Sequence, residues 1–175
     1  DQFNTALKTH DMKEVGSWDD FSTPDMFRKE TIKEAWSYWN WRILRSDVEP
    51  GNDYKILAKL IDAFGRDNSF VQTSNIDQLH VKQGHEFILE ELHGSLARLQ
   101  CSHPCDDTLY RTNSMDLTDP QSYPKCPKCH SYLRPNVLLF GDWNFVDAHH
   151  MVQKDNFHKF CQKFTHVSTQ KKNFV

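Results

Sequence analysis

Apolar residues recur at helical spacing through the first third of the chain. One set places tryptophans and aliphatic residues on a single helix face, which is typical of a core-facing amphipathic helix. Its members are Ile32, Ala35, Trp36, Trp39 and Ile43. Upstream, Thr23 followed by Pro24 has the pattern of an N-cap and a first helical position. After the break at "VEPGND", a second helix is predicted by Tyr54, Leu57, Ala58 and Ile61, with Asn52 or Asp53 as its cap.

The pattern changes to short β-prone runs after about residue 65. "SFVQTSN", "EFILEEL" and "NVLLF" each predict a strand. "NVLLF" is almost continuously apolar between Pro135 and Gly141, as expected of a strand buried on both faces of a parallel sheet. A helical stretch is predicted from about Val146 to Phe164. Strands mixed with helices in this way indicate an α/β fold.

The bulk composition narrows the class of protein. The 175 residues carry 38% hydrophobic side chains, 21 basic residues and 24 acidic residues, for a net charge of −3. A nucleic-acid-binding protein usually has a basic surplus, so we expect no direct nucleic-acid partner. No apolar run is long enough to span a bilayer, and no apolar core of a signal peptide is present. We therefore expect a soluble intracellular protein, cytoplasmic or nuclear and not secreted, with no membrane partner.

Four of the five cysteines form two close pairs. Cys101 and Cys105 enclose "SHP", and Cys126 and Cys129 enclose "PK". Two such pairs supply the four thiolates of a tetrahedral structural zinc site, and the polar loop between them cannot build a core of its own. Four protein ligands leave no open position, so the zinc would be structural and not catalytic. Disulfides or redox chemistry are the alternatives, and His103 or His130 could replace a cysteine as ligand.

Together with their flanks, these pairs resemble a known family. "VQTSNIDQLH", "LEELHGSLARLQC", the second cysteine pair and "LRPNVLLFGD" follow one another in this order. This combination resembles the sirtuins, the NAD-dependent protein deacylases, over about residues 23–142. The resemblance implies a Rossmann-like parallel sheet with a helical insert and a small zinc-binding module.

The resemblance also implies roles for individual residues. His93 would be the catalytic general base that takes a proton from a ribose hydroxyl of NAD. NAD would be held by the segment that follows the first predicted strand: Thr73, Ser74, Asn75, Ile76 and Asp77. An acylated protein or peptide would pair with the "VLLFG" segment, whose Val137, Leu138, Phe140 and Gly141 would line the acyl-lysine channel. The cofactors implied are NAD as co-substrate and a structural Zn²⁺.

Three positions depart from the family pattern. Ser74 stands where the family has glutamine, Gln78 where it has glycine, and Asp142 where it has glutamate. The short Ser74 side chain leaves NAD hydrolysis or ADP-ribosyl transfer as an alternative reaction. A zinc-stabilised interaction module without catalysis is the alternative outside the enzymes.

The glycine-rich phosphate-binding loop of the family is not found in the sequence. The six glycines contain no G-x-G, and the family's later Gly-Ser/Thr segment does not follow. We therefore expect a central part of a longer protein, in which "KKNFV" begins a strand, and weak NAD binding by the 175 residues alone.

The predicted organisation has four consecutive parts. Residues 1–65 are the helical part of a small domain, and residues 66–97 carry the NAD and catalytic segments. Residues 98–134 are the zinc-binding module, and residues 135–175 return to the Rossmann-like part. The function that follows is NAD-dependent deacylation of protein lysines, with the acyl group transferred to ADP-ribose and nicotinamide released.

Overall fold

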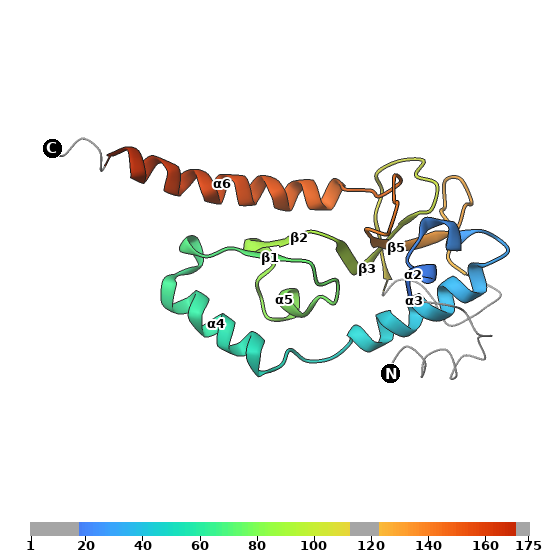
Figure 1. The fold of residues 1–175 in the computed structure, drawn as a ribbon, viewed down its shortest axis with the longest axis horizontal. Helices are drawn as coiled ribbons and strands as arrows, with labels where there is room; N and C mark the ends of the chain where they lie inside the picture. Colours follow the sequence, from blue (N-terminus) through green and yellow to red (C-terminus); the bar gives the residue numbers. More distant parts are fainter. Residues whose placement is uncertain (1–17, 113–122, 171–175) are drawn as a thin grey trace. The chain divides into compact units, whose positions relative to one another are not determined.

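A computed structural model describes residues 18–112 and 123–170, which form two compact units (Figure 1). The first unit combines segments up to Asp47 with Gly94–Val146, and the second combines Val48–His93 with the chain from Asp147 onward. The predicted strand at "KKNFV", residues 1–17 of the predicted helical part and residues 113–122 of the predicted zinc module lie outside the described residues. The four-part division of the sequence stays a prediction.

The second unit contains a small parallel sheet. Strand β1 (Val71–Thr73) pairs with β2 (Leu89–Glu91) in the register Val71↔Leu89 to Thr73↔Glu91. Between them come α5 (Leu79–Lys82) and the 3-10 helix η3 (Glu86–Ile88). Helix α6 (Ala148–Gln170) packs along β2 (Figure 1). The two predicted strands "SFVQTSN" and "EFILEEL", their parallel pairing and the helix after Val146 are confirmed.

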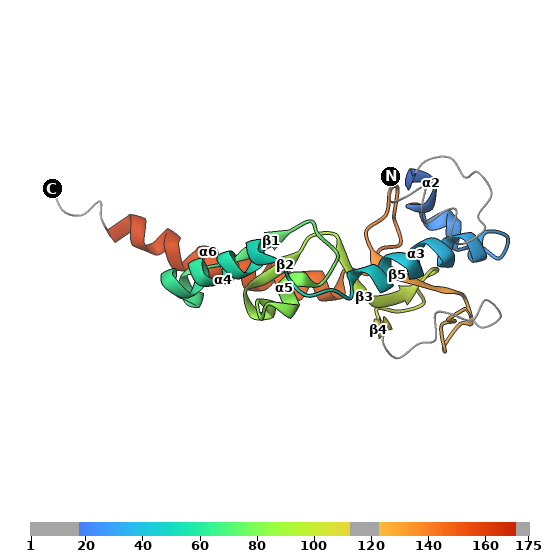
Figure 2. The same cartoon turned by 90° about the horizontal axis from the view of Figure 1, so that it is seen from below.

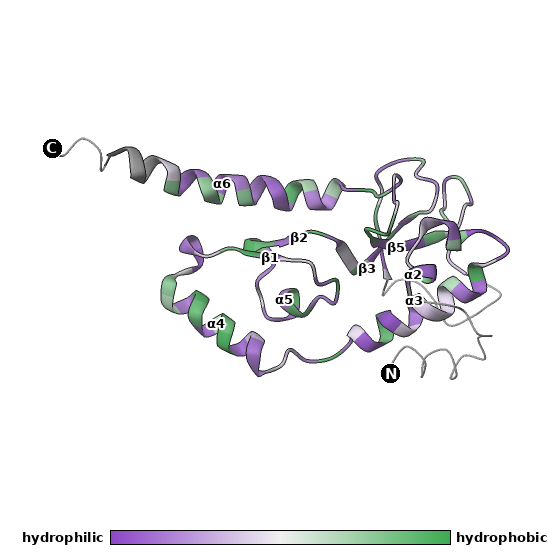
Figure 3. Cartoon of the chain, viewed as in Figure 1, coloured by the Kyte–Doolittle hydropathy of each residue, from purple (hydrophilic) through white to green (hydrophobic). Residues whose placement is uncertain are grey.

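The helix predicted around Tyr54–Ile61 is α4 (Asn52–Phe64), which is followed by the 3-10 helix η2 (Arg66–Asn68). Its predicted inner face is confirmed, because Ile61 is buried and Tyr54 is half-buried. Green and purple alternate along it in Figure 3, as expected of an amphipathic helix. The predicted cap is wrong: the N-cap is Gly51, and Asn52 is the first helical residue.

The first unit contains an antiparallel sheet. Strand β3 (Gly94–Cys101) lies between β4 (Tyr110–Arg111) and β5 (Leu133–Val137). The described part of this unit also contains three helical segments: α2 (Trp18–Phe21), the 3-10 helix η1 (Pro24–Phe27) and α3 (Ile32–Ser46). Figure 2 shows β3, β4 and β5 from a second direction.

The strand prediction for "NVLLF" is wrong in two respects. The strand starts earlier, at Leu133, and ends at Val137, and it is antiparallel to its partner β3. Leu138 and Phe140 leave the sheet and are 42% and 57% exposed, although Leu139 between them is buried. The backbone N–H of Phe140 donates to the carbonyl of Ser22 instead of to a neighbouring strand.

The aromatic face predicted for α3 is confirmed as core. Trp36 and Trp39 are each 1% exposed, and the Trp39 indole donates to the Phe21 carbonyl at 3.0 Å. Phe27 meets Trp36 edge-to-face with ring centres 6.2 Å apart. The predicted start at Thr23-Pro24 belongs to η1, because α3 begins only at Ile32. In the described part of the chain, no helix is long and apolar enough to cross a membrane.

Gly94 sets the start of β3 through its backbone conformation and its close contact. Its φ is +74°, and a Cβ there would lie 2.1 Å from the carbonyl oxygen of Asn136 on β5. Gly141, in the same unit, has φ +66°, but a Cβ added to it would meet no atom within 4 Å.

We predict that Gly94→Ala lowers the free energy of unfolding by about 3 kcal/mol or more, since it adds a backbone clash to left-handed strain. Gly141→Ala, the matched control, should cost only the strain, about 1–2 kcal/mol. If chemical denaturation gave the same loss of unfolding free energy for both variants, the close Gly94–Asn136 contact would not be the cause of the Gly94→Ala effect.

Candidate functional site

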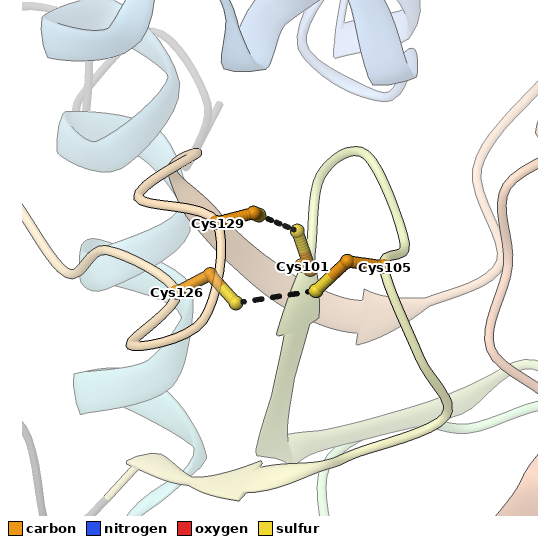
Figure 4. A group of neighbouring side chains, drawn as sticks. All are labelled: Cys101, Cys105, Cys126 and Cys129. Atoms are coloured by element: carbon orange, nitrogen blue, oxygen red, sulfur yellow. Dashed lines mark hydrogen bonds between the residues drawn. The ribbon is translucent and has the colours of Figure 1, made fainter.

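The four paired cysteines converge in the first unit (Figure 4). Cys101 ends β3, and Cys105 lies in the turn that follows. Cys126 and Cys129 form a turn before β5, where the Cys126 N–H donates to Ser131 and the His130 N–H to Cys126. All four sulfur atoms lie within 4.8 Å of one another.

The electrostatics of the cluster favour charge on Cys129 over Cys101. Burial, and next the hydrogen bond with Cys129, raise the pKa of Cys101 to about 12. Hydrogen bonds from Ser131 lower the pKa of Cys129 to about 6. The two sulfur atoms are 3.4 Å apart, so one proton can be shared between them.

The geometry fits a tetrahedral zinc site. The four cysteines are free thiols, and the Cys101–Cys129 and Cys105–Cys126 sulfur distances are 3.4 and 3.7 Å. Four sulfurs around one Zn²⁺ at ordinary bond lengths lie about 3.8 Å apart, whereas a disulfide requires about 2.05 Å. Among the described residues, His103 and His130 are not part of the converging group, and Cys161 lies on α6 in the other unit.

The predicted NAD segment and the predicted base lie at the same end of the small parallel sheet. Thr73 ends β1, and its carbonyl accepts the N–H of Leu92, so the pairing continues to the residue before His93. His93 is exposed at this point. The carboxyl ends of parallel strands are where open α/β sheets bind ligands.

Local hydrogen bonds shape the segment from Thr73 to Asp77. The Thr73 hydroxyl accepts from the N–H of Asn75 at 3.0 Å, and the Asp77 carboxylate accepts from the N–H of Leu79 at 3.1 Å. Ser74 and Asn75 are exposed, whereas Ile76 and Asp77 are half-buried. Asn75 also donates to the Tyr54 hydroxyl at 3.3 Å, which ties the segment to α4.

Two buried carboxylates support this end of the sheet, and the sequence did not reveal them. Glu90 and Glu91 are 3% and 2% exposed. Glu90 accepts from Gln72 at 2.7 Å and pairs with His150 at 3.0 Å. Consecutive strand residues point to opposite faces, so burial of both requires cover on both sides of β2. In the sequence, the two residues look like the polar end of the strand predicted at "EFILEEL". Their burial depends on segments distant in the sequence, which the sequence pattern does not reveal.

The predicted substrate segment follows β5 and is held by a buried ion pair. The Arg134 guanidinium contacts both carboxylate oxygens of Asp142, at 2.8 and 2.7 Å, and both side chains are fully buried. Arg134 also donates to the carbonyl of Val137, and Asp142 accepts the N–H groups of Leu139 and Asn144. The pair therefore closes the loop that carries Leu138, Phe140 and Gly141. The sequence analysis did not predict this ion pair.

The site residues thus fall into two groups. Those predicted for catalysis and NAD binding come together in the second unit. Those predicted for substrate and metal binding lie in the first unit, at opposite ends of β5.

Comparisons with known proteins identify the family of the chain. The model of the Sir2 family matches residues 8–170. The NAD-dependent protein deacylases of Thermococcus sibiricus and Aquifex aeolicus are 34% and 32% identical over 136 and 139 residues. A solved structure described as Sir2 bound to acetylated peptide aligns with a TM-score of 0.58 and 25% identity, over 78% of this chain and 56% of that one. The fold is that of the sirtuins, and the chain belongs to the Sir2 family.

The chain spans about half the length of the curated relatives it matches. It aligns through 73% of its residues with 51% of the Thermococcus sibiricus protein, and through 76% with 55% of the Aquifex aeolicus protein.

We predict that Cys126→Ser loses most of the zinc bound by the purified protein and lowers the melting temperature, because three thiolates cannot complete the tetrahedron. Elemental analysis and calorimetry measure both quantities. Cys161→Ser, the matched control, should retain zinc. A Cys126→Ser protein with one zinc per chain and an unchanged melting temperature would rule out the four-cysteine site.

A histidine pair beside the NAD segment predicts a pH dependence of stability. The Nδ1 atoms of His80 and His85 are 3.4 Å apart. Burial lowers the pKa of His80 from 6.5, although Asp77 opposes this. Burial and the neighbouring His80 lower the pKa of His85. The remaining charged groups that act on His85 are Arg66, Asp62 and Glu86.

Because the unfolded chain takes up these protons first, the free energy of unfolding should fall as the pH drops below about 6.5. The contribution of the pair should be constant above that pH. His85→Asn should reduce the slope of stability against pH below about pH 6.5, whereas His158→Asn, at an exposed position on α6, should not. An equal slope in wild type and His85→Asn would contradict the assignment.

Proposed function

We propose that the protein is an NAD-dependent protein lysine deacylase that transfers the acyl group to ADP-ribose and releases nicotinamide. The observation that carries the proposal is the position of His93. It follows β2 at the carboxyl end of the small parallel sheet, where the Thr73–Asp77 segment follows β1. In a Sir2-family chain, this position supports the assignment of His93 as a base beside the segment proposed to bind NAD.

His93 is the proposed general base. Its imidazole is exposed at the strand end, where a ring nitrogen can accept a proton from a ribose hydroxyl. Thr73, Ser74, Asn75, Ile76 and Asp77 are the proposed NAD-binding residues. The Asn75 amide and the Asp77 carboxylate are already oriented by Tyr54 and the Leu79 N–H, so they would hold the nicotinamide and ribose end with little reorganisation. NAD supplies the ribose carbon that takes up the acyl oxygen and the nicotinamide that leaves.

The acylated protein or peptide is proposed to bind the segment after β5. β5 is an edge strand of its described sheet, so an extended peptide can be added beside it. Val137 is buried, whereas the Leu138 and Phe140 side chains are exposed, and Gly141 has no side chain to obstruct an approaching backbone. One solved relative at 25% identity is described as holding 2'-O-acetyl-ADP-ribose and a deacetylated peptide, which supports this substrate class.

Zn²⁺ is proposed as a structural ion held by Cys101, Cys105, Cys126 and Cys129. Four cysteine ligands leave no open position on the ion for substrate. The site would therefore stabilise β3 and β5 and take no part in proton transfer. Free thiols arranged for a metal are typical of a reducing compartment, which supports an intracellular location.

NAD hydrolysis or ADP-ribosyl transfer is the second candidate. Ser74 favours it, because its short, exposed side chain replaces the family's glutamine within the NAD segment. Release of nicotinamide without acylated peptide would distinguish these reactions from deacylation.

We predict that His93→Ala in the full-length protein lowers peptide-dependent nicotinamide release at least about a hundredfold, since a general base contributes that much. The melting temperature should stay unchanged because His93 is exposed. His158→Ala on α6 is the control for removal of an exposed imidazole and should keep wild-type turnover. Full activity of His93→Ala would dismiss His93 as the base.

A further inference from the structure

Gln78 has an unusual backbone conformation at the end of the proposed NAD segment. Its φ and ψ are 67° and 8°, in the left-handed region. Apart from glycine, only Gln78 and His130 have a positive φ in the described part of the chain. An L-residue with a long side chain is disfavoured there, and glycine is the residue that fits without strain. Gln78 follows Asp77 directly and caps α5.

The side chain of Gln78 makes a contact that glycine could not make. Its amide nitrogen donates to the Glu91 carboxylate at 2.5 Å. Glu91 is 2% exposed and lies on β2, two residues before His93. The bond therefore joins the turn after β1 to the strand that leads to the proposed base.

Glu91 is itself fixed, so the contact has a rigid anchor. Its N–H donates to the Gln153 side chain at 2.9 Å, and its second carboxylate oxygen accepts from the Gln153 amide at 3.3 Å. His149 lies 3.8 Å from the same oxygen. A buried carboxylate held from α6 cannot easily move to follow Gln78, so it is the turn that is held in place.

We infer that Gln78 is a positioning residue for NAD: its bond to Glu91 fastens the turn carrying Asn75 and Asp77 at the end of the parallel sheet beside His93. This inference rests on the proposed function. Glycine would leave the turn with the bonds of Asn75 and Asp77 and a freer backbone. Glutamine accepts backbone strain and adds a charge-assisted hydrogen bond to Glu91.

The test compares Gln78→Gly and Gln78→Asn with wild type in the full-length protein. Glycine removes the bond and relieves the strain. Asparagine tolerates the left-handed conformation, but its side chain is one methylene shorter and falls short of Glu91. Both variants should raise KM for NAD about tenfold, the value of one hydrogen bond to a charged group, with little change in kcat. Gln78→Gly should not lower the melting temperature.

Gln72→Ala is the matched control. Gln72 makes the same type of bond, to Glu90 at 2.7 Å, but lies within β1 and not in the turn. It should leave KM for NAD close to wild type. A lower melting temperature with unchanged KM in the Gln78 variants would show a purely structural role and overturn the inference.

Hydrogen exchange without NAD separates this inference from the proposed function. The amides of residues 74–80 should exchange faster in Gln78→Gly than in wild type, with no change in β3. If wild type releases no nicotinamide, the proposed function fails, and the exchange result alone decides whether Gln78 holds the turn. Unchanged exchange at residues 74–80 would overturn the inference whatever the enzyme does.

Discussion

The antiparallel pairing of β3 with β5 determines where each functional segment of the first unit lies. The register runs from Gly94↔Val137 to Cys101↔Leu133, with an irregularity between Ser95 and Leu99. One end of the pairing brings the two cysteine pairs together, and the other ends beside the loop proposed to bind substrate. A zinc ion at the cysteines would therefore influence the substrate loop only by stabilising the pairing between them.

Buried polar groups maintain this pairing. The Gln100 side-chain oxygen accepts from the Asn136 amide at 2.9 Å and from the N–H of Val146 at 3.1 Å. Arg134, on the same strand as Asn136, forms the buried pair with Asp142. These hydrogen bonds and this ion pair connect β3 and β5 to the chain after β5 and hold that chain in place.

In the second unit, buried carboxylates stabilise the sheet. Strands β1 and β2, the strands described in this unit, contain three residues each, too few to be stable by their hydrogen bonds alone. Glu90 and Glu91 on β2 bond to glutamine and histidine side chains from β1, from the turn after β1 and from α6. The proposed NAD-binding turn is thus supported by carboxylates that take no part in the proposed chemistry.

Local patterns allowed part of this to be predicted. The apolar spacing of α3 and α4, the β-prone runs and the cysteine pairs each depend on residues close in sequence. β3 was missed because Ser95 and Gln100 are buried on it without an apolar alternation. The end of β5 was predicted too late in the chain because the apolar Leu138 and Phe140 continue the strand pattern. In the structure, the ion pair of Arg134 with Asp142 turns the chain away from β3 after Val137. Contacts between distant polar residues leave no periodic signal, so they had to be seen in the structure.

Identifying the molecule that receives the acyl group is the decisive test of the proposed reaction. The full-length protein would be incubated with NAD and an acetyl-lysine peptide, and the products identified by mass spectrometry. We predict equal amounts of deacetylated peptide, nicotinamide and O-acetyl-ADP-ribose, with none formed in the absence of peptide. Free ADP-ribose formed without peptide, or nicotinamide release with the peptide still acetylated, would contradict the proposed deacylation.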